Sequence, residues 1–232
     1  MAIIYGRADS ESKLLAKLPK EVKNVEDMDR VRKDFFRKMK KERHGKKGIF
    51  GTIVSEVKRY NYKRQVDKFQ YKKIGNLRTG TYGENDVIDE LEKLDDSYHI
   101  LCGVEMELDH WVTYNGRKNL KSAQMDIVVV CPKGVFMIEV KNWSDKYVPN
   151  KNSLSPYEQT ERAGRVLWIT LQNKVGDIRV TNVLLSIRGN LPYSKNYRSV
   201  YVSSLAEINQ FLKNRQGSLS EKEIKKIVMK LT

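Results

Sequence analysis

The sequence predicts an α/β fold preceded by a basic helical region. From residue 84 onward, hydrophobic periodicity gives the order helix, three strands, helix, and then further strands and helices. The basic charge lies before this part: residues 1–80 hold 23 Lys and Arg against 10 Asp and Glu, whereas residues 81–232 hold 21 against 19. A chain of 232 residues, 40% of them hydrophobic, is long enough for one sizeable core or for one domain with an appendage.

The N-terminal region carries two helical patterns. Residues 14–41 have apolar positions at gaps of three and four, which predicts an amphipathic helix interrupted near Pro19. A polar break at 44–48 precedes a second helical pattern at 49–60. Residues 59–73, RYNYKRQVDKFQYKK, interleave aromatic and basic side chains. This mixture suits phosphate contact with stacking on bases, and it equally suits a helix whose aromatics pack while its lysines reach solvent.

A linker is predicted at residues 76–84, NLRTGTYGE, because charge balance and periodicity change there. We therefore place a domain boundary near residue 78. Residues 1–78 would form a basic helical region, a helical hairpin serving nucleic-acid contact or oligomerisation. Residues 79–232 would form the α/β domain.

The elements of the α/β domain follow in order. A helix begins near Glu84, which lies at the edge of its inward face in the first turn. An Asn-Gly turn is predicted within 114–119, and a Ser-Pro helix entry starts the helix at 155–174. One or two helices are expected in 204–231. The expected strands are 98–108, 125–131, 135–142, 178–187 and 199–204.

The stretch QMDIVVVCPKGVFMIEVKNW reads as two apolar strands joined by the four-residue loop CPKG. Because side chains alternate along a strand, Glu139 and Lys141 share one face. A hairpin closed by that loop places Asp126 directly opposite Glu139, with Cβ atoms about 4.5–5.5 Å apart. A slip of one residue would put the two acids on opposite faces, so the inference depends on the loop length.

Two carboxylates in direct opposition destabilise a sheet, and partial burial adds to the cost. A divalent cation between Asp126 and Glu139 removes this cost, and hard oxygen ligands suit Mg²⁺, with Mn²⁺ as an alternative. Lys141 would lie beside the ion, where an ammonium stabilises charge that develops during phosphodiester hydrolysis. Glu84 would add a ligand or orient a water. The competing interpretation is a partly buried ion pair between Lys141 and one of the acids, without catalysis.

Several motifs resemble those of the nuclease-related domain (NERD) family, within the PD-(D/E)xK nuclease superfamily. They are YGEND with Glu84, MDIVVV with Asp126, and GVFMIEVKNW with Glu139-Val140-Lys141. SPYEQ, ahead of an amphipathic helix, is similar to the start of that family's second helix. The resemblance covers about residues 80–212. It implies a restriction-endonuclease-like core, a mixed central sheet flanked by helices, with Mg²⁺-dependent nuclease activity.

The resemblance also implies roles for individual residues. Asp126 and Glu139 would bind the metal ion, with the Val140 carbonyl as a further ligand, and Lys141 would be the catalytic lysine. Glu84 would be the helix-borne acid, and Gln159 would support the site or contact the nucleic acid. No residue of the motif is missing, so an active enzyme is expected. The catalytic candidates are Glu84, Asp126, Glu139, Lys141 and Gln159.

The basic excess of the N-terminal third indicates a polyanionic partner, with a solvated face that aids solubility as the alternative. Nucleic acid is favoured over a membrane because no lipidation or membrane-insertion signal is present, and DNA is favoured over RNA. The basic segment HWVTYNGRKNLKSAQ, before Asp126, is expected to be a substrate-facing loop. The candidate nucleic-acid contacts are Lys58, Arg59, Lys63, Arg64, Lys72, Lys73, Arg117, Lys118 and Lys121.

Composition excludes several other classes. No run approaches the ~18 apolar residues of a membrane helix, and the N-terminus lacks the pattern of a signal peptide. Cys102 and Cys131 show no CxxC spacing and are expected to be reduced, packed thiols. The three histidines are scattered and form no zinc signature. A cytoplasmic protein is therefore expected.

The leading hypothesis is a metal-dependent nuclease whose N-terminal helices add affinity for nucleic acid. The alternative is a non-catalytic nucleic-acid-binding or interaction module that retains the nuclease fold. In a third hypothesis, residues 10–75 form a helical hairpin that joins two copies of the chain, because their apolar stripe is adequate for a homodimer.

Overall fold

The chain forms two compact units in the computed structural model, Ser10–Thr81 and a second unit that combines Met1–Asp9 with Tyr82–Thr232. Each unit has a hydrophobic core of its own. We refer to the second unit as the sheet domain. The structure describes residues 1–42, 49–69, 72–142, 154–188, 191, 193–217 and 219–232.

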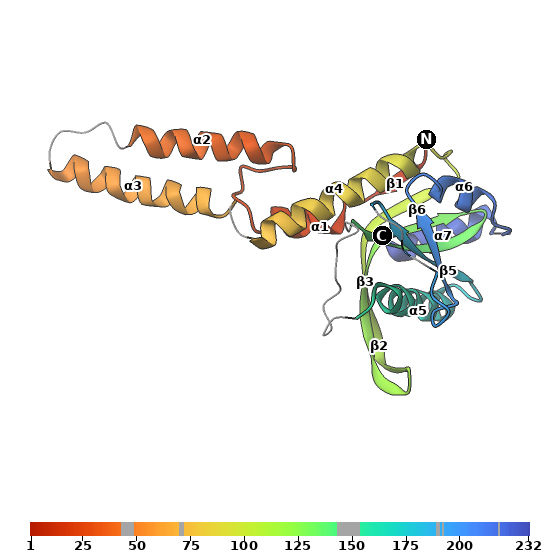
Figure 1. The fold of residues 1–232 in the computed structure, drawn as a ribbon. Helices are drawn as coiled ribbons and strands as arrows, with labels where there is room; N and C mark the ends of the chain where they lie inside the picture. Colours follow the sequence, from red (N-terminus) through yellow and green to blue (C-terminus); the bar gives the residue numbers. More distant parts are fainter. Residues whose placement is uncertain (43–48, 70–71, 143–153, 189–190, 192, 218) are drawn as a thin grey trace. The chain divides into compact units, whose positions relative to one another are not determined.

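The Ser10–Thr81 unit is helical, as predicted (Figure 1). It contains most of α1 (Asp9–Leu15), α2 (Asp27–Lys41), α3 (Ile49–Asp67) and the start of α4 (Lys72–Glu92). The expected interruption near Pro19 is confirmed, since the chain between α1 and α2 contains no long helix. The core of this unit consists of Leu14, Leu18, Val22, Val25, Met28, Val31, Phe35, Val66 and Ile74.

Residues 76–84, predicted as a linker, are helical, because α4 runs through them without a break. The division between the two compact units nevertheless falls within them, between Thr81 and Tyr82. The threonines and glycines of this segment have low intrinsic helix propensity, but burial outweighs propensity here. Thr81 and Glu84 are buried at helical spacing, followed by Val87 and Leu91. The Thr81 hydroxyl also donates to the carbonyl of Leu77 at 2.9 Å, so its polar atom is satisfied within the helix.

The sheet domain is built on one mixed six-stranded sheet in the order β1-β2-β3-β4-β5-β6. β2, β3 and β4 are antiparallel neighbours, whereas β1 runs parallel to β2, and β5 and β6 continue parallel to β4. The prediction did not include β1, whose three residues are too few to show a period. The strands are β1 (Ile3–Tyr5), β2 (His99–Tyr114), β3 (Arg117–Cys131), β4 (Gly134–Lys141), β5 (Val180–Ser186) and β6 (Val200–Ser204).

Helices cover both faces of the sheet. α5 (Pro156–Lys174) and α7 (Glu221–Leu231) pack on one face, where alternate strand residues such as Val128 and Met137 meet them. The last part of α4 and α6 (Ile208–Lys213) pack on the other face. The predicted α/β class, a mixed sheet flanked by helices, is confirmed.

The segment expected to be a substrate-facing loop before Asp126 is instead part of a long β2–β3 hairpin. The predicted Asn-Gly turn lies at its tip, where Asn115 has φ 48° and Gly116 has φ 74°. Positive φ at both positions is the backbone that a two-residue hairpin turn of matching twist requires. The pairing of Tyr114 with Arg117 continues the strands up to this turn, so no loop forms.

Two expectations from composition concern the state of the cysteines and the presence of a membrane-spanning helix. Cys102 and Cys131 are both buried free thiols, as predicted. Across the described part of the chain, none of the helices combines the length and the apolar character needed to cross a membrane.

Two glycines of α4 allow a matched test of its packing. A Cβ on Gly83 would lie 2.7 Å from Ile187 Cδ1 and 2.8 Å from Asn142 Cβ, whereas one on Gly75 would meet nothing within 4 Å. Gly83→Ala should therefore lower the thermal unfolding midpoint, at a cost of about 1–3 kcal/mol for overpacking. Gly75→Ala should raise the midpoint, because alanine in place of glycine inside a helix stabilises the folded state by up to ~1 kcal/mol. Equal shifts of one sign in circular dichroism melts would contradict this packing.

Candidate active site

The register of β3 against β4 decides where the predicted site residues lie. The paired positions run from Cys131↔Gly134 to Ile127↔Ile138. The predicted register is confirmed, although Cys131 and Gly134 themselves pair, so only two residues form the turn. One step beyond Ile127 and Ile138, Asp126 on β3 stands opposite Glu139 on β4.

The strand pairing stops at this step because the Asp126 side chain replaces the next backbone partner. Val140 N–H donates to Asp126 Oδ2 at 2.8 Å. On its other side, β4 remains paired with β5 through Lys141↔Ser186. Since the N–H and C=O of one strand residue leave on the same side, the Val140 carbonyl also faces the β3 side. The two carboxylates and this carbonyl therefore border the place where β3 and β4 separate.

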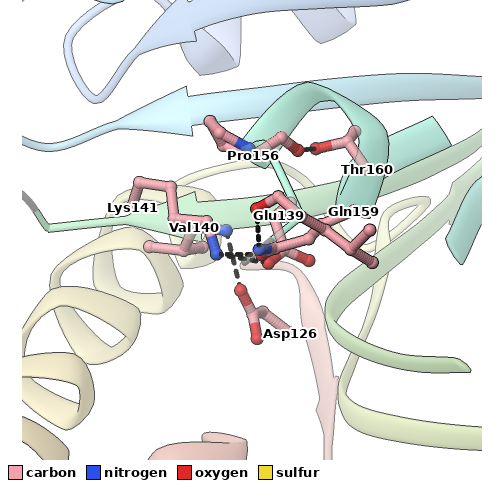
Figure 2. Close-up of polar contacts among 8 residues, drawn as sticks. Asp126, Glu139, Val140, Lys141, Pro156, Gln159 and Thr160 are labelled. Carbon is pink, nitrogen blue, oxygen red and sulfur yellow. Dashed lines mark hydrogen bonds and ion pairs between the residues drawn. The ribbon is translucent and has the colours of Figure 1, made fainter. Parts of the chain in front are cut away.

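Lys141 lies on the same side of β4 as Glu139, as predicted from strand alternation. Its Nζ is 2.6 Å from Glu139 Oε1, and it donates to Gln159 Oε1 at 2.9 Å (Figure 2). The Lys141 and Glu139 side chains are only 15% and 10% exposed. The ammonium is therefore held between a strand carboxylate and a helix amide, in a partly enclosed position.

The start of α5 positions Gln159. Ser155 caps the helix by accepting from the Glu158 N–H at 3.1 Å, and Pro156 occupies the first helical position, as SPYEQ predicted. Thr160 donates to the Pro156 carbonyl at 2.7 Å (Figure 2). The Gln159 amide nitrogen donates to the Leu154 carbonyl at 2.8 Å. This bond orients the amide so that its oxygen, the acceptor, faces Lys141.

Glu84 reaches the site from α4 and is buried, with 5% of its surface exposed. The absence of a side chain on Gly83 lets α4 approach the end of β4 closely, at Asn142. Sequence reasoning identified Glu84 but missed Gly83. The sequence signal for this close approach was the position of Gly83, directly before an acid at the inward edge of a helix.

Burial and like charge together govern Asp126. Desolvation raises the pKa of its carboxyl well above the ordinary range, and the charges of Glu139 and Glu84 raise this pKa further. The Val140 N–H and the Lys141 ammonium act in the opposite direction. Burial, with a contribution from Glu84, also raises the pKa of the Cys102 thiol to about 12, so this thiol is inert. The negative charges of Glu139 and Glu84 thus both act on the Asp126 carboxyl.

The residues present fit a hard divalent cation. In the described part of the chain, no group of three or more His, Cys, Asp or Glu side chains is arranged to hold a metal ion. Mg²⁺, however, commonly uses only one or two carboxylates and keeps several waters. Asp126 and Glu139 supply two carboxylates, and the Val140 carbonyl on the same side adds a neutral oxygen. A cation there would also relieve the repulsion that raises the pKa of Asp126.

The predicted nucleic-acid contacts fall into two groups: those at positions 58–73 belong to the Ser10–Thr81 unit, and those at positions 117–121 belong to the sheet domain. Lys58, Arg59, Lys63 and Arg64 lie on α3 in the helical unit, and Arg59 is paired with Glu56 at 3.0 Å. Lys72 and Lys73 begin α4, and Arg117 and Lys118 begin β3, but their side chains lie outside the described part of the structure. Lys121 on β3 is paired with Glu107 across the hairpin at 2.6 Å.

Comparison with known proteins identifies one family. Residues 79–187 match the family model of the nuclease-related domain, NERD, which confirms the resemblance drawn from the motifs. The matched segment contains Glu84, Asp126, Glu139, Lys141 and Gln159. No curated protein and no solved structure matches the chain. The similarity to this family therefore covers residues 79–187, slightly less than half of the chain.

Replacing Asp126 with asparagine tests whether the negative charge of its carboxylate destabilises the metal-free protein. Asparagine keeps an oxygen for the Val140 N–H but removes the charge that faces Glu139 and Glu84. At neutral pH with a chelator present, Asp126→Asn should raise the unfolding midpoint by about 2–4 °C, as expected for ~1 kcal/mol. Asp86→Asn, at an exposed position of α4, should leave it unchanged. A lower midpoint for Asp126→Asn would show that the carboxylate stabilises the fold.

Proposed function

We propose that this protein is a metal-dependent nuclease that hydrolyses phosphodiester bonds, most favourably in DNA, with Mg²⁺ or Mn²⁺ as its cofactor. The observation that supports it best is the opposition of Asp126 and Glu139 beside Lys141, inside a segment that matches a nuclease-related domain. The mixed sheet flanked by helices is compatible with a restriction-endonuclease-like core of the PD-(D/E)xK superfamily.

In this proposal Asp126 and Glu139 hold the metal ion, with the Val140 carbonyl as a further ligand. The ion, when bound, lowers the pKa of a coordinated water and offsets charge on the phosphate. Lys141 Nζ, already fixed by Glu139 and Gln159, holds a positive donor where charge develops or orients the attacking water. Glu84, on α4, is a further ligand of the metal ion or orients a water molecule.

The additional acids around Lys141 favour a catalytic site over the competing interpretation, a simple ion pair. A lysine and a glutamate alone would satisfy each other, but Asp126 is a second carboxylate opposite the first, and Glu84 contributes a third negative charge. An ion pair that served stability alone gains nothing from these extra acids, since each adds repulsion and desolvation. Functional sites are where such costs are retained.

The α3 cations extend the proposal to substrate affinity. Lys58, Lys63 and Arg64 are exposed on one helix of the Ser10–Thr81 unit. We propose that they contact phosphates without sequence preference, which would make binding weaken steeply as salt rises. The exposed Tyr60 among them could stack on a base.

Cleavage assays with site variants test the proposed activity. Wild type should cleave labelled linear, circular, single-stranded or branched DNA or RNA in Mg²⁺ or Mn²⁺, and a chelator should stop it. Lys141→Ala should reduce the rate about 10²–10³-fold, as does loss of one transition-state donor in other enzymes. Glu139→Ala should reduce it at least as much. Lys222→Ala, at an exposed position of α7, is the matched control and should retain full activity.

The alternative function, a non-catalytic nucleic-acid-binding module, gives the opposite pattern in these assays. Nucleic acid would bind, but no substrate in the panel would be cut by wild type under any divalent metal. Retention of wild-type circular dichroism by both variants is required so that lost activity reports chemistry. Cleavage that persists in Glu139→Ala would place the chemistry elsewhere.

A further inference from the structure

A cavity of about 850 Å³ lies in the sheet domain, at the end of the sheet where β4, β5 and β6 begin. Its lining includes Gly134, at the start of β4, and Val180 and Thr181, at the start of β5. Glu139 of the candidate active site lies further along β4. At about 3.3 Å per residue, it is about 17 Å from Gly134 along the strand. This cavity, here called the strand-start cavity, is therefore separate from the candidate active site.

One wall of the strand-start cavity is formed by residues 214–217, which follow α6. Gly217 lies so close to the β3–β4 turn that a Cβ on it would be 2.1 Å from the Lys133 carbonyl oxygen. Leu219 N–H donates to the Pro132 carbonyl at 3.2 Å. The wall is thus anchored to the turn, and a cavity lined by fixed groups binds a ligand at a lower entropic cost than one lined by mobile groups.

Two aromatic rings hold Arg215 in the lining. Its guanidinium lies 4.0 Å from the ring centre of Tyr201 and 4.3 Å from that of Phe211. Tyr201 pairs with Val183, a residue of the core under α6, so this stack belongs to the α6 face of the sheet. Arg215 Nε is buried and has no hydrogen-bond partner among the described residues. This cation has therefore lost water without gaining a protein acceptor, which is costly unless an anion binds beside it.

Two further cations, Lys133 and Arg179, line the strand-start cavity, and both are exposed. Within the described ranges, neither they nor Arg215 form an ion pair with an acid. The acid in the described lining is Asp177, which accepts from the Gln172 amide at 2.8 Å. Three cations against one acid leave a net charge of +2 in this cavity.

Neutral donors also line the cavity. Thr181 pairs with Phe136, a residue of the core under α6, so its hydroxyl lies on the same side of the sheet as Arg215. Asn214 Oδ1 accepts from Gln210 at 2.9 Å, which leaves the Asn214 NH₂ group as a donor. Hydroxyl and amide donors add hydrogen bonds to the oxygens of an anion that the cations attract.

The charge and the size of the strand-start cavity indicate the class of its ligand. A phosphate monoester carries a charge of about −1.5 to −2 at neutral pH, which matches the net charge of the lining better than a single carboxylate does. Guanidinium groups donate paired hydrogen bonds to phosphate oxygens. Sites for small organic molecules measure about 300–1,000 Å³, so the volume also leaves room for an organic part beside the phosphate.

We propose that the strand-start cavity binds a small organic molecule that carries a phosphate or diphosphate group, with this group held by Lys133, Arg179 and Arg215. The organic part lies beside Tyr201, whose side chain is 44% exposed. The inference stands on the cavity and does not depend on the proposed nuclease activity.

Isothermal titration calorimetry of the full-length protein tests this binding, with a chelator present so that no metal ion takes part. The probes are sodium pyrophosphate, ADP, sodium acetate and a single-stranded oligothymidylate. Pyrophosphate and ADP should give saturable heats with one site per chain, and acetate should give none. Arg179→Gln should weaken the affinity for ADP about tenfold, because it removes one charged donor. Arg179 is exposed, so this variant should keep the wild-type circular dichroism.

Three control variants separate this site from other places where phosphate can bind. Arg188→Gln removes an exposed arginine at the opposite end of β5 and should keep the wild-type affinity for ADP. Lys141→Ala, in the candidate active site, and Lys63→Gln, on α3, should keep it as well.

Several results would overturn the proposal. They are the absence of a saturable heat with both phosphate probes, an unchanged affinity of Arg179→Gln, and loss of ADP binding in Lys141→Ala or Lys63→Gln. Binding of acetate as tight as that of ADP would refute the phosphate class. Binding of the oligothymidylate without binding of ADP would show that the cavity serves a polynucleotide instead.

Discussion

The hydrogen bond from Val140 N–H to the Asp126 carboxylate is the constraint on which the candidate site depends. It ends the β3–β4 pairing one step after Ile127↔Ile138 and keeps Asp126 beside β4. Through it, the Val140 N–H bonds to a side chain instead of to the backbone of β3. The same bond holds one of the two opposed carboxylates while β5 supports the other side of β4.

The rest of the sheet domain supports this arrangement. Val128, Val129 and Ile138 are completely buried, and burial of each such side chain contributes about 1.5–3 kcal/mol. These contributions offset the cost of keeping Asp126, Glu139 and Glu84 close together. The two helices that add Glu84 and Gln159 pack on opposite faces of the sheet, so the site draws on both cores. Its groups are thereby fixed by rigid elements, as precise chemistry requires.

The site could be predicted largely because strand geometry is periodic. Alternation placed Glu139 and Lys141 on one face, and the turn length set Asp126 opposite Glu139, since both rules are local. The Ser-Pro cap of α5 and the Asn-Gly turn at 115–116 were likewise readable from short motifs. In contrast, residues 76–84 look like a linker because no local pattern shows that this part of α4 packs, through Gly83, against the distant Asn142 and Ile187. The stacking of Arg215 on Tyr201 also joins segments that no local pattern connects.

Divalent-metal binding is the central requirement of this account, and isothermal titration calorimetry measures it most directly. Mn²⁺ titrated into the wild-type protein should give a saturable heat. Glu139→Ala should abolish this heat, while Asp86→Ala, which removes an exposed acid of α4, should leave it unchanged. Equal heats for wild type and Glu139→Ala would mean that Asp126 and Glu139 do not form a metal centre, and the assignment of the active site would fail.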